Sequence, residues 1–127
     1  MMAVDTSARM AVVLDAPEAD ACIAALEVDG DLLISAGTVA EALIVAGRRN
    51  VGDEMARLID GLGFQIVSVT PASARRVAQA YAAWGKGVHP AALTFGDCFA
   101  YEVAKEQRCR LLHVGEDFRK ADVESVL

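Results

Sequence analysis

The chain has 127 residues, of which 54% are hydrophobic and 6% aromatic, and a mass of 13.4 kDa. This length and hydrophobic content exclude a disordered protein and leave no room for two independent cores. We therefore predict a single domain over residues 1–127. The net charge of −6 argues against a protein that holds nucleic acid by overall positive charge.

The charge is unevenly distributed along the chain. Residues 1–60 carry four Lys or Arg against eleven Asp or Glu, whereas residues 61–127 carry eight against seven. The segment 61–96 has no acidic residue at all. The overall figure therefore combines a strongly acidic first half with a nearly neutral second half.

Cysteine usage and hydropathy indicate an intracellular protein. The three cysteines, Cys22, Cys98 and Cys109, are an odd number, with no C-x-x-C motif and no His at zinc-ligand spacing. Neither a disulfide framework nor a zinc site is indicated. No apolar run approaches the roughly 18 residues of a membrane helix, and the N-terminus lacks the basic region of a signal peptide. We expect a soluble, cytoplasmic protein.

Segments typical of strands and helices alternate along the chain. In order, the sequence predicts a strand that ends at residue 4, a helical stretch over 8–14, a helix over 16–28, a strand over 32–35, and helices over 38–46 and 53–62. It then predicts a strand over 64–69, a helix over 70–84, a loop over 85–90, a helix over 94–107, and strands over 110–114 and 123–126. Because helices separate the strands, we expect a parallel sheet covered by helices on both faces.

Three helix starts carry capping signatures. Asp15 is the predicted N-cap of the helix over 16–28, because a proline and a glutamate follow at suitable positions. Thr38 and Glu41 have the spacing of a capping box, and Asp97 has the same relation to Thr94. Taken singly, Glu41 and Asp97 could serve only as capping residues.

Four acidic residues are predicted to meet at one edge of the sheet. Asp5 follows the first strand and Asp117 follows the strand over 110–114, while Glu41 and Asp97 lie near helix starts. Sites in open α/β sheets form outside the carboxyl ends of the strands. Clustered carboxylates cannot all ionise without a compensating cation, and an all-oxygen site suits Mg²⁺, with Mn²⁺ as a substitute. The topology therefore predicts a divalent-metal site.

Four motifs follow one another over the whole chain. They are Val4-Asp5-Thr6-Ser7-Ala8, Ser35-Ala36-x-Thr38-x-Ala40-Glu41-Ala42, Gly85-Lys86-Gly87-x-His89-Pro90-Ala91-x-Leu93-x-Phe95-Gly96-Asp97-Cys98, and Leu111-Leu112-x-x-Gly115-x-Asp117-Phe118. Together they resemble the PIN-domain ribonucleases, specifically VapC-type toxins of bacterial type II toxin–antitoxin (VapBC) pairs. The resemblance implies a three-layer α/β/α sandwich around a short, mainly parallel sheet.

The same resemblance implies an activity and partners. The chain would be a Mg²⁺-dependent endoribonuclease toxin with Asp5, Glu41, Asp97 and Asp117 as its catalytic, metal-binding acids. Asp122 would either support this quartet or replace Asp117. Cleavage would use a metal-activated water and no protein nucleophile. A homodimer and a complex with a cognate VapB-type antitoxin are also implied.

RNA binding by an acidic chain requires local positive charge. Arg76, Lys86 and His89 lie in the acid-free segment, and the loop over 85–90 could present backbone N–H groups to phosphates. Thr6, next to Asp5, could donate a hydrogen bond to a ligand or phosphate. We predict that these four residues contact the RNA substrate. The alternative is that Arg75 and Arg76 lie on a solvated helix face.

Two other functions are compatible with the acids. One is a non-catalytic PIN-like module that docks a basic partner peptide at the acidic site. The other is a phosphatase of a different α/β fold with Asp5 as nucleophile, which is disfavoured because Ser7 stands where that chemistry wants a second Asp. His113 is predicted to be a hydrogen-bonded core histidine and Cys98 a small buried side chain.

Overall fold

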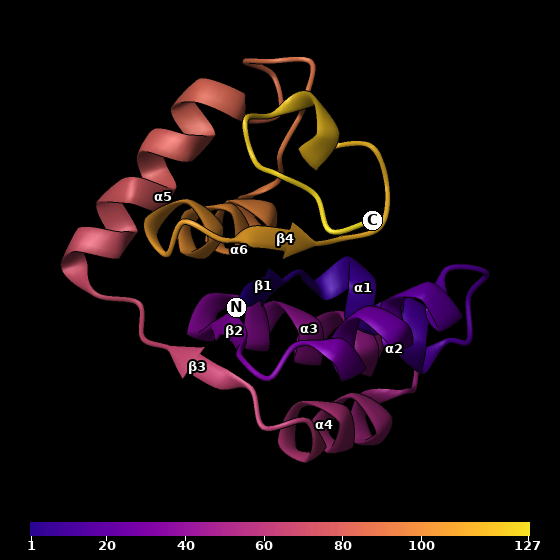
Figure 1. The fold of residues 1–127 in the computed structure, drawn as a ribbon. Helices are drawn as coiled ribbons and strands as arrows, with labels where there is room; N and C mark the ends of the chain where they lie inside the picture. Colours follow the sequence, from indigo (N-terminus) through magenta and orange to yellow (C-terminus); the bar gives the residue numbers. More distant parts are fainter.

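The computed structural model describes residues 1–127, and at its centre lies a four-stranded sheet (Figure 1). The strands are β1 (Met2–Val4), β2 (Leu32–Ser35), β3 (Gln65–Val67) and β4 (Arg110–Leu112). Their order is β3-β2-β1-β4, and every pair is parallel. The predicted parallel α/β architecture is confirmed.

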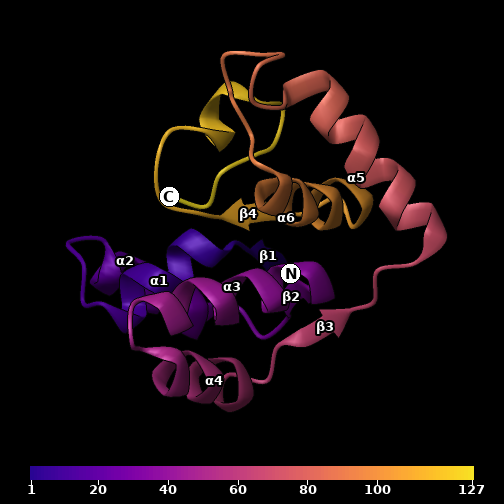
Figure 2. The same cartoon turned by 180° about the vertical axis from the view of Figure 1, so that it is seen from behind.

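Two helices connect each strand to the next. They are α1 (Thr6–Val13), α2 (Ala19–Val28), α3 (Ala36–Arg48), α4 (Gly52–Gly61), α5 (Pro71–Trp84) and α6 (Phe95–Glu106), and a short 3₁₀ turn, η1 (Phe118–Lys120), follows β4. In both views α4 lies at one end of the molecule, and α5 lies toward the other end with the loop that follows it (Figures 1 and 2). None of these helices is long and apolar enough to cross a membrane.

The sheet has a hydrophobic core on each face, because successive strand residues point to opposite sides. One core contains Ala3, Leu33 and Leu111 with residues of α5 and α6, and the other contains Met2, Val4, Leu32 and Leu112 with residues of α1 and α2. The helices and the sheet therefore form the three layers that the resemblance implied.

A third, smaller core joins helices to one another. It consists of Met10 from α1, Ala42 and Ala46 from α3, and Met55 and Ile59 from α4. The small alanines let α3 approach α1 closely. This packing matters for function, because it brings the start of α3 next to the start of α1.

Two of the predicted N-caps are wrong. Asp15 lies in the turn after α1 with a φ of 52°, and α2 begins four residues later without a side-chain cap. Thr38 does not begin α3 either, because Ser35 at the end of β2 accepts a hydrogen bond from Gly37 N at 3.1 Å and starts the helix earlier. The N-cap is thus set by where the preceding strand stops. Glu41 consequently lies beyond the first turn and is not part of a capping box.

The predicted strand over 123–126 is also wrong. Only Ser125 bridges to Leu111, beside the outer edge of β4. β4 itself ends at Leu112, two residues earlier than predicted. The sheet therefore keeps four strands, and the last residues of the chain cover its β4 edge.

Candidate active site

The order of the strands reverses between β1 and β4. The chain places β2 and β3 on one side of β1, then returns through α5 and α6 to place β4 on the other side. In open α/β sheets such a reversal opens a crevice at the carboxyl ends of the two strands, where ligands bind. Asp5 lies at this point, and its N–H donates to Leu112 O at 2.9 Å across the two strands.

One carboxylate oxygen of Asp5 is fixed and the other is not. Asp5 caps α1, and its Oδ2 accepts hydrogen bonds from Ser7 N at 3.0 Å and from Ser7 Oγ at 2.6 Å. Ser7 Oγ in turn accepts from Val114 N at 3.0 Å, which ties the start of α1 to the chain after β4. Asp5 is only 2% exposed, and its Oδ1 has no hydrogen-bond partner within the protein. Oδ1 is therefore the oxygen left to bind a ligand.

Glu41 lies between α1 and α6. Its Oε1 accepts a hydrogen bond from Thr6 Oγ1 at 2.6 Å. Its Oε2 lies so close to Gly96 that a Cβ at that position would be 1.6 Å away. Burial raises the pKa of Glu41, the hydrogen bond from Thr6 lowers it, and the negative charge of Asp5 raises it further. The carboxylate is thus held in place from two sides and repelled by a second acid.

Asp97 is a capping residue and also a member of the acidic group. Thr94 Oγ1 accepts from Asp97 N at 3.2 Å, and Asp97 Oδ2 accepts from Thr94 N at 2.9 Å, which completes a capping box at the start of α6. Burial raises the pKa of Asp97 to about 6 against the hydrogen bonds from Thr94, and the charges of Asp5 and Glu41 raise it further. Asp5 and Glu41 are therefore close enough to Asp97 to affect its ionisation.

No hydrogen bond joins the other two predicted acids to this group. Asp117 is exposed at the start of η1 and makes no side-chain cap there. Asp122 accepts hydrogen bonds from the Tyr101 hydroxyl and, at 3.3 Å, from Lys105 Nζ. Its carboxylate is therefore held against α6 by these two side chains.

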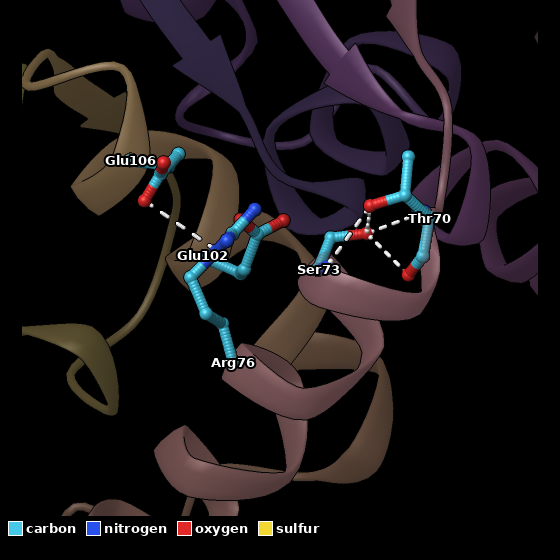
Figure 3. Close-up of polar contacts among 5 residues, drawn as sticks. All are labelled: Thr70, Ser73, Arg76, Glu102 and Glu106. Carbon is cyan, nitrogen blue, oxygen red and sulfur yellow. Dashed lines mark hydrogen bonds and ion pairs between the residues drawn. The ribbon is translucent and has the colours of Figure 1, made fainter.

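Arg76, predicted to contact RNA, is engaged within the protein (Figure 3). Its Nε lies 3.0 Å from Glu102 Oε2 and 3.4 Å from Glu106 Oε2. Glu102 is only 7% exposed, so this ion pair satisfies a buried carboxylate. Figure 3 also shows the capping box of Thr70 and Ser73 that begins α5. Arg76 thus fastens α5 to α6, and the alternative of a solvated helix face does not describe it.

The other three residues predicted to contact the substrate differ in whether their side chains already have partners within the protein. Thr6 donates to Glu41. His89 Nδ1 accepts from Ala91 N at 3.0 Å, and its ring packs edge-on against Trp84 with 4.7 Å between centroids. Lys86 is exposed, and its side chain makes no ion pair. Only Lys86 therefore has its charge fully available to a partner.

The two residues that were predicted to lie in the core, His113 and Cys98, are buried. His113 is 1% exposed, and its Nε2 is 2.9 Å from Ser125 Oγ, which confirms a hydrogen-bonded core histidine. Cys98 is fully buried, and burial raises the pKa of its thiol to about 11. Such a thiol stays protonated at neutral pH and is a poor nucleophile.

Sequence reasoning missed Arg9. This side chain is 0% exposed, and none of its guanidinium nitrogens has a hydrogen-bond partner. Burial lowers its pKa to about 10, whereas the negative charges of Asp5 and Glu41 raise it. Its Cζ lies 5.8 Å from the centroid of the Phe64 ring. A signal was present, because Arg9 is the one charged residue in the apolar stretch 8–14 and stands one helical turn after Asp5.

The donor set fits a hard divalent cation. As the side chains stand, no three His, Cys, Asp or Glu residues are close enough to hold one ion jointly. The charge of Asp5 nevertheless raises the pKa values of the half-buried Glu41 and Asp97, and the buried Asp5 Oδ1 lacks a partner. Oxygen ligands of this kind suit Mg²⁺ or Mn²⁺, whose charge would relieve the repulsion. The predicted metal site remains a prediction that these residues can satisfy.

An apolar cavity of about 240 Å³ adjoins Glu41 between α3 and α6. Its lining residues are Gly37, Ala40, Glu41, Ile44, Val45, Phe95, Gly96 and Phe99. Phe95 is 69% exposed and Ile44 is 59% exposed. Large apolar side chains that remain exposed around a cavity are typical of an interaction surface.

Known proteins resemble the chain over almost its whole length. The PIN domain family model matches residues 2–124. The chain is 37% identical to "Ribonuclease VapC30" of Mycobacterium tuberculosis over 128 residues, which cover 98% of each chain. Among solved structures, Mycobacterium tuberculosis VapC20, described as a Sarcin-Ricin loop cleaving toxin, superposes with a TM-score of 0.82 at 14% identity, covering 99% of this chain and 98% of that one. VapBC2 from Rickettsia felis, bound to a DNA fragment from its promoter, gives a TM-score of 0.72 at 14% identity, covering 98% and 96%.

Proposed function

This chain belongs to the PIN-domain family of VapC ribonuclease toxins, and we propose that it is a divalent-metal-dependent endoribonuclease. The observation that carries the proposal is a group of three neighbouring carboxylates, that of Asp5 buried and those of Glu41 and Asp97 half-buried, beside the point where the strand order reverses. The relative VapC30 is named a ribonuclease, which supports RNA as the substrate. The acids proposed to act are Asp5, Glu41, Asp97 and Asp117.

Each acid has a distinct way of holding the cation. Asp5 would bind through Oδ1, because Ser7 fixes Oδ2. Glu41 is oriented by Thr6, and Asp97 is oriented by the cap of α6. Asp117 follows β4 at the same edge of the sheet and is exposed, so its carboxylate is free to approach the other three. When bound, Mg²⁺ or Mn²⁺ supplies a Lewis acid that polarises a phosphoryl oxygen and acidifies a water.

The protein's own hydrogen bonds fix the carboxylates, and one of these carboxylates holds a proton. The partners that fix Asp5 and Glu41 are backbone and hydroxyl groups, so these carboxylates need no solvent to stay in place. Asp97, with a pKa of about 6, is partly protonated near neutral pH in the metal-free protein. Its proton resides on Oδ1, because Oδ2 accepts from a backbone N–H. Cation binding requires the deprotonated carboxylate and should therefore release this proton.

Positive charge for the RNA would come from Lys86. Like Arg75, it is an exposed cation of the acid-free segment that makes no ion pair, and it begins the turn that leads to Asp97. Thr6, Arg76 and His89 have internal contacts that give each a structural role, and they would reach RNA only by giving up those contacts.

The partner proposed is a VapB-type antitoxin, as the solved VapBC2 assembly suggests. The cavity with Ile44 and Phe95 at its rim would take apolar side chains of the antitoxin, while the adjoining acids would take a basic one. A homodimer is also proposed from the family resemblance. Light scattering of the purified chain would give its mass in solution.

The experiment compares RNA cleavage by the native protein with cleavage by Asp5→Asn, in Mn²⁺ and in EDTA. The amide oxygen of Asn keeps the cap of α1, so the variant should fold while losing a ligand oxygen. We expect loss of cleavage in Asp5→Asn and in EDTA, and native cleavage by Asp60→Asn, which removes the same charge from an exposed site on α4.

Two outcomes would contradict the proposal. Undiminished cleavage by folded Asp5→Asn, or cleavage that resists EDTA, would exclude the metal mechanism. A native protein that cleaves no RNA in Mn²⁺ yet binds basic peptides at the acidic site would instead favour the non-catalytic docking module.

A further inference from the structure

Arg9 is the buried charge of the site that the proposed chemistry leaves unused. It is 0% exposed, and Nε and both terminal nitrogens lack hydrogen-bond partners. It stands four residues after Asp5 on α1, so the two side chains share one face of that helix. A guanidinium group stays protonated inside proteins, and a buried charge without a partner is strongly unfavourable.

The neighbouring helix α3 carries a second buried polar group without a partner. Thr38 is fully buried on α3, and its Oγ1 also lacks a partner. Thr38 precedes Glu41 by three residues, so these two share a face of α3, and α3 packs against α1. The unpartnered atoms of Asp5, Arg9 and Thr38 thus belong to helix faces that carry the proposed metal ligands.

The nearest opposite charges explain how Arg9 is tolerated. Both Asp5 and Glu41 interact electrostatically with it, although neither is close enough for an ion pair. Charges act over longer distances in a poorly solvated interior than in water. The face of Phe64 offers a further weak attraction at 5.8 Å. The attraction that stabilises Arg9 must equally stabilise the ionised acids.

We propose that Arg9 is a resident counter-ion of the acidic site, which offsets part of the charge of Asp5 and Glu41 and thereby weakens the binding of the divalent cation. Arg9 is a positioning residue, because it acts on the ion through the acids. The proposal rests on the proposed function, since it presupposes that these acids bind a metal. It implies that Arg9 stabilises the folded protein when no metal is bound to the acids, and that the same positive charge lowers the affinity for the metal.

The test is calorimetric titration with Mn²⁺ of the native protein, Arg9→Met, Arg9→Gln and Arg9→Lys. Both neutral variants should bind Mn²⁺ on the order of tenfold more tightly, because a nearby positive charge no longer repels the ion. Arg9→Lys should stay within about twofold of the native affinity. Arg57→Met is the matched control, because Arg57 is exposed on α4 and its loss should leave the affinity unchanged.

Thermal melting with and without Mn²⁺ gives a second readout, because a tighter ion raises the melting temperature further. Affinities that are equal in the native protein and in both neutral variants, while Asp5→Asn abolishes binding, would overturn the role of Arg9 and leave the proposed function intact. An absence of Mn²⁺ binding in the native protein and in every Arg9 variant would overturn both.

Discussion

Gly96 offers the most direct test of how the acidic group is built. A Cβ at this position would lie 1.6 Å from Glu41 Oε2 and 2.3 Å from its Cδ, whereas ordinary contacts begin near 3.4 Å. In Gly96→Ala the carboxylate of Glu41 must therefore move by about 2 Å. The side chain of Glu41 is flexible enough to move, so the backbone of α6 should keep its path.

The displacement has an energetic and a catalytic consequence. It breaks the 2.6 Å hydrogen bond from Thr6 to Glu41, which is worth about 1.5–3 kcal/mol for a charged acceptor. Replacing a helical glycine by alanine returns up to about 1 kcal/mol. We expect the free energy of unfolding to fall by about 1–2 kcal/mol, which leaves the protein folded. A misplacement on this scale should reduce RNA cleavage about 100-fold.

Gly47→Ala provides the matched control for this substitution. Gly47 lies in α3, the helix of Glu41, and nothing approaches its Cβ position within 4 Å. This variant should be up to about 1 kcal/mol more stable than the native protein and should cleave RNA at the native rate. Urea unfolding in EDTA and initial cleavage rates in Mn²⁺ measure both quantities. If Gly96→Ala kept native stability and native cleavage, the carboxylate of Glu41 would not lie between Gly96 and Thr6.

Two further predictions concern charge. The pKa of Asp97 rises from 3.8 to about 6 on folding, so the folded state binds more protons in this window and the free energy of unfolding falls as pH rises through it. Urea unfolding in EDTA should find Asp97→Asn about 1–2 kcal/mol more stable than the native protein at pH 7.5 but not at pH 4, and the same pH slope for both would refute this. Arg76→Met should lower the free energy of unfolding by about 2 kcal/mol, because Glu102 loses its partner, and should leave RNA binding unchanged. Lys86→Glu should leave the free energy of unfolding unchanged and weaken RNA binding. A filter-binding assay in which both variants bind RNA equally weakly would contradict the different roles given to Arg76 and Lys86.

The sheet could be predicted because its strands are short apolar runs between turn residues. Leu32–Ser35 needed no knowledge of the partner strands, since the run is buried on both faces. The helix starts were harder to predict from the sequence. Thr38 and Ser35 are both good N-caps, and the choice fell to Ser35 because β2 ends there. Where a strand ends depends on its neighbours in the sheet, and this information is not local in sequence.

The acidic group could be predicted from topology for a similar reason. Asp5 follows β1 and Asp97 begins α6, and parallel strands direct such positions to one edge, whereas Glu41 reaches the group from the second turn of α3. Asp117 follows Gly115, whose φ of 104° redirects the chain, so its distance from the others depends on one loop. No pattern along the chain fixes the path of such a loop.

The acid-free segment shows where a linear charge pattern misleads. The segment contains no acid, yet folding brings acids from elsewhere in the chain next to it. Arg76 forms ion pairs with Glu102 and Glu106, which lie on a helix some thirty residues later. Arg9 is buried inside the protein and is likewise not available to RNA. Of the acid-free segment, Arg75 and Lys86 remain as exposed cations without an ion pair, which is little positive charge for a protein of net charge −6 to bind a polyanion. The cation that the acids are proposed to bind must therefore supply part of the attraction for RNA, so that one ion serves both binding and cleavage.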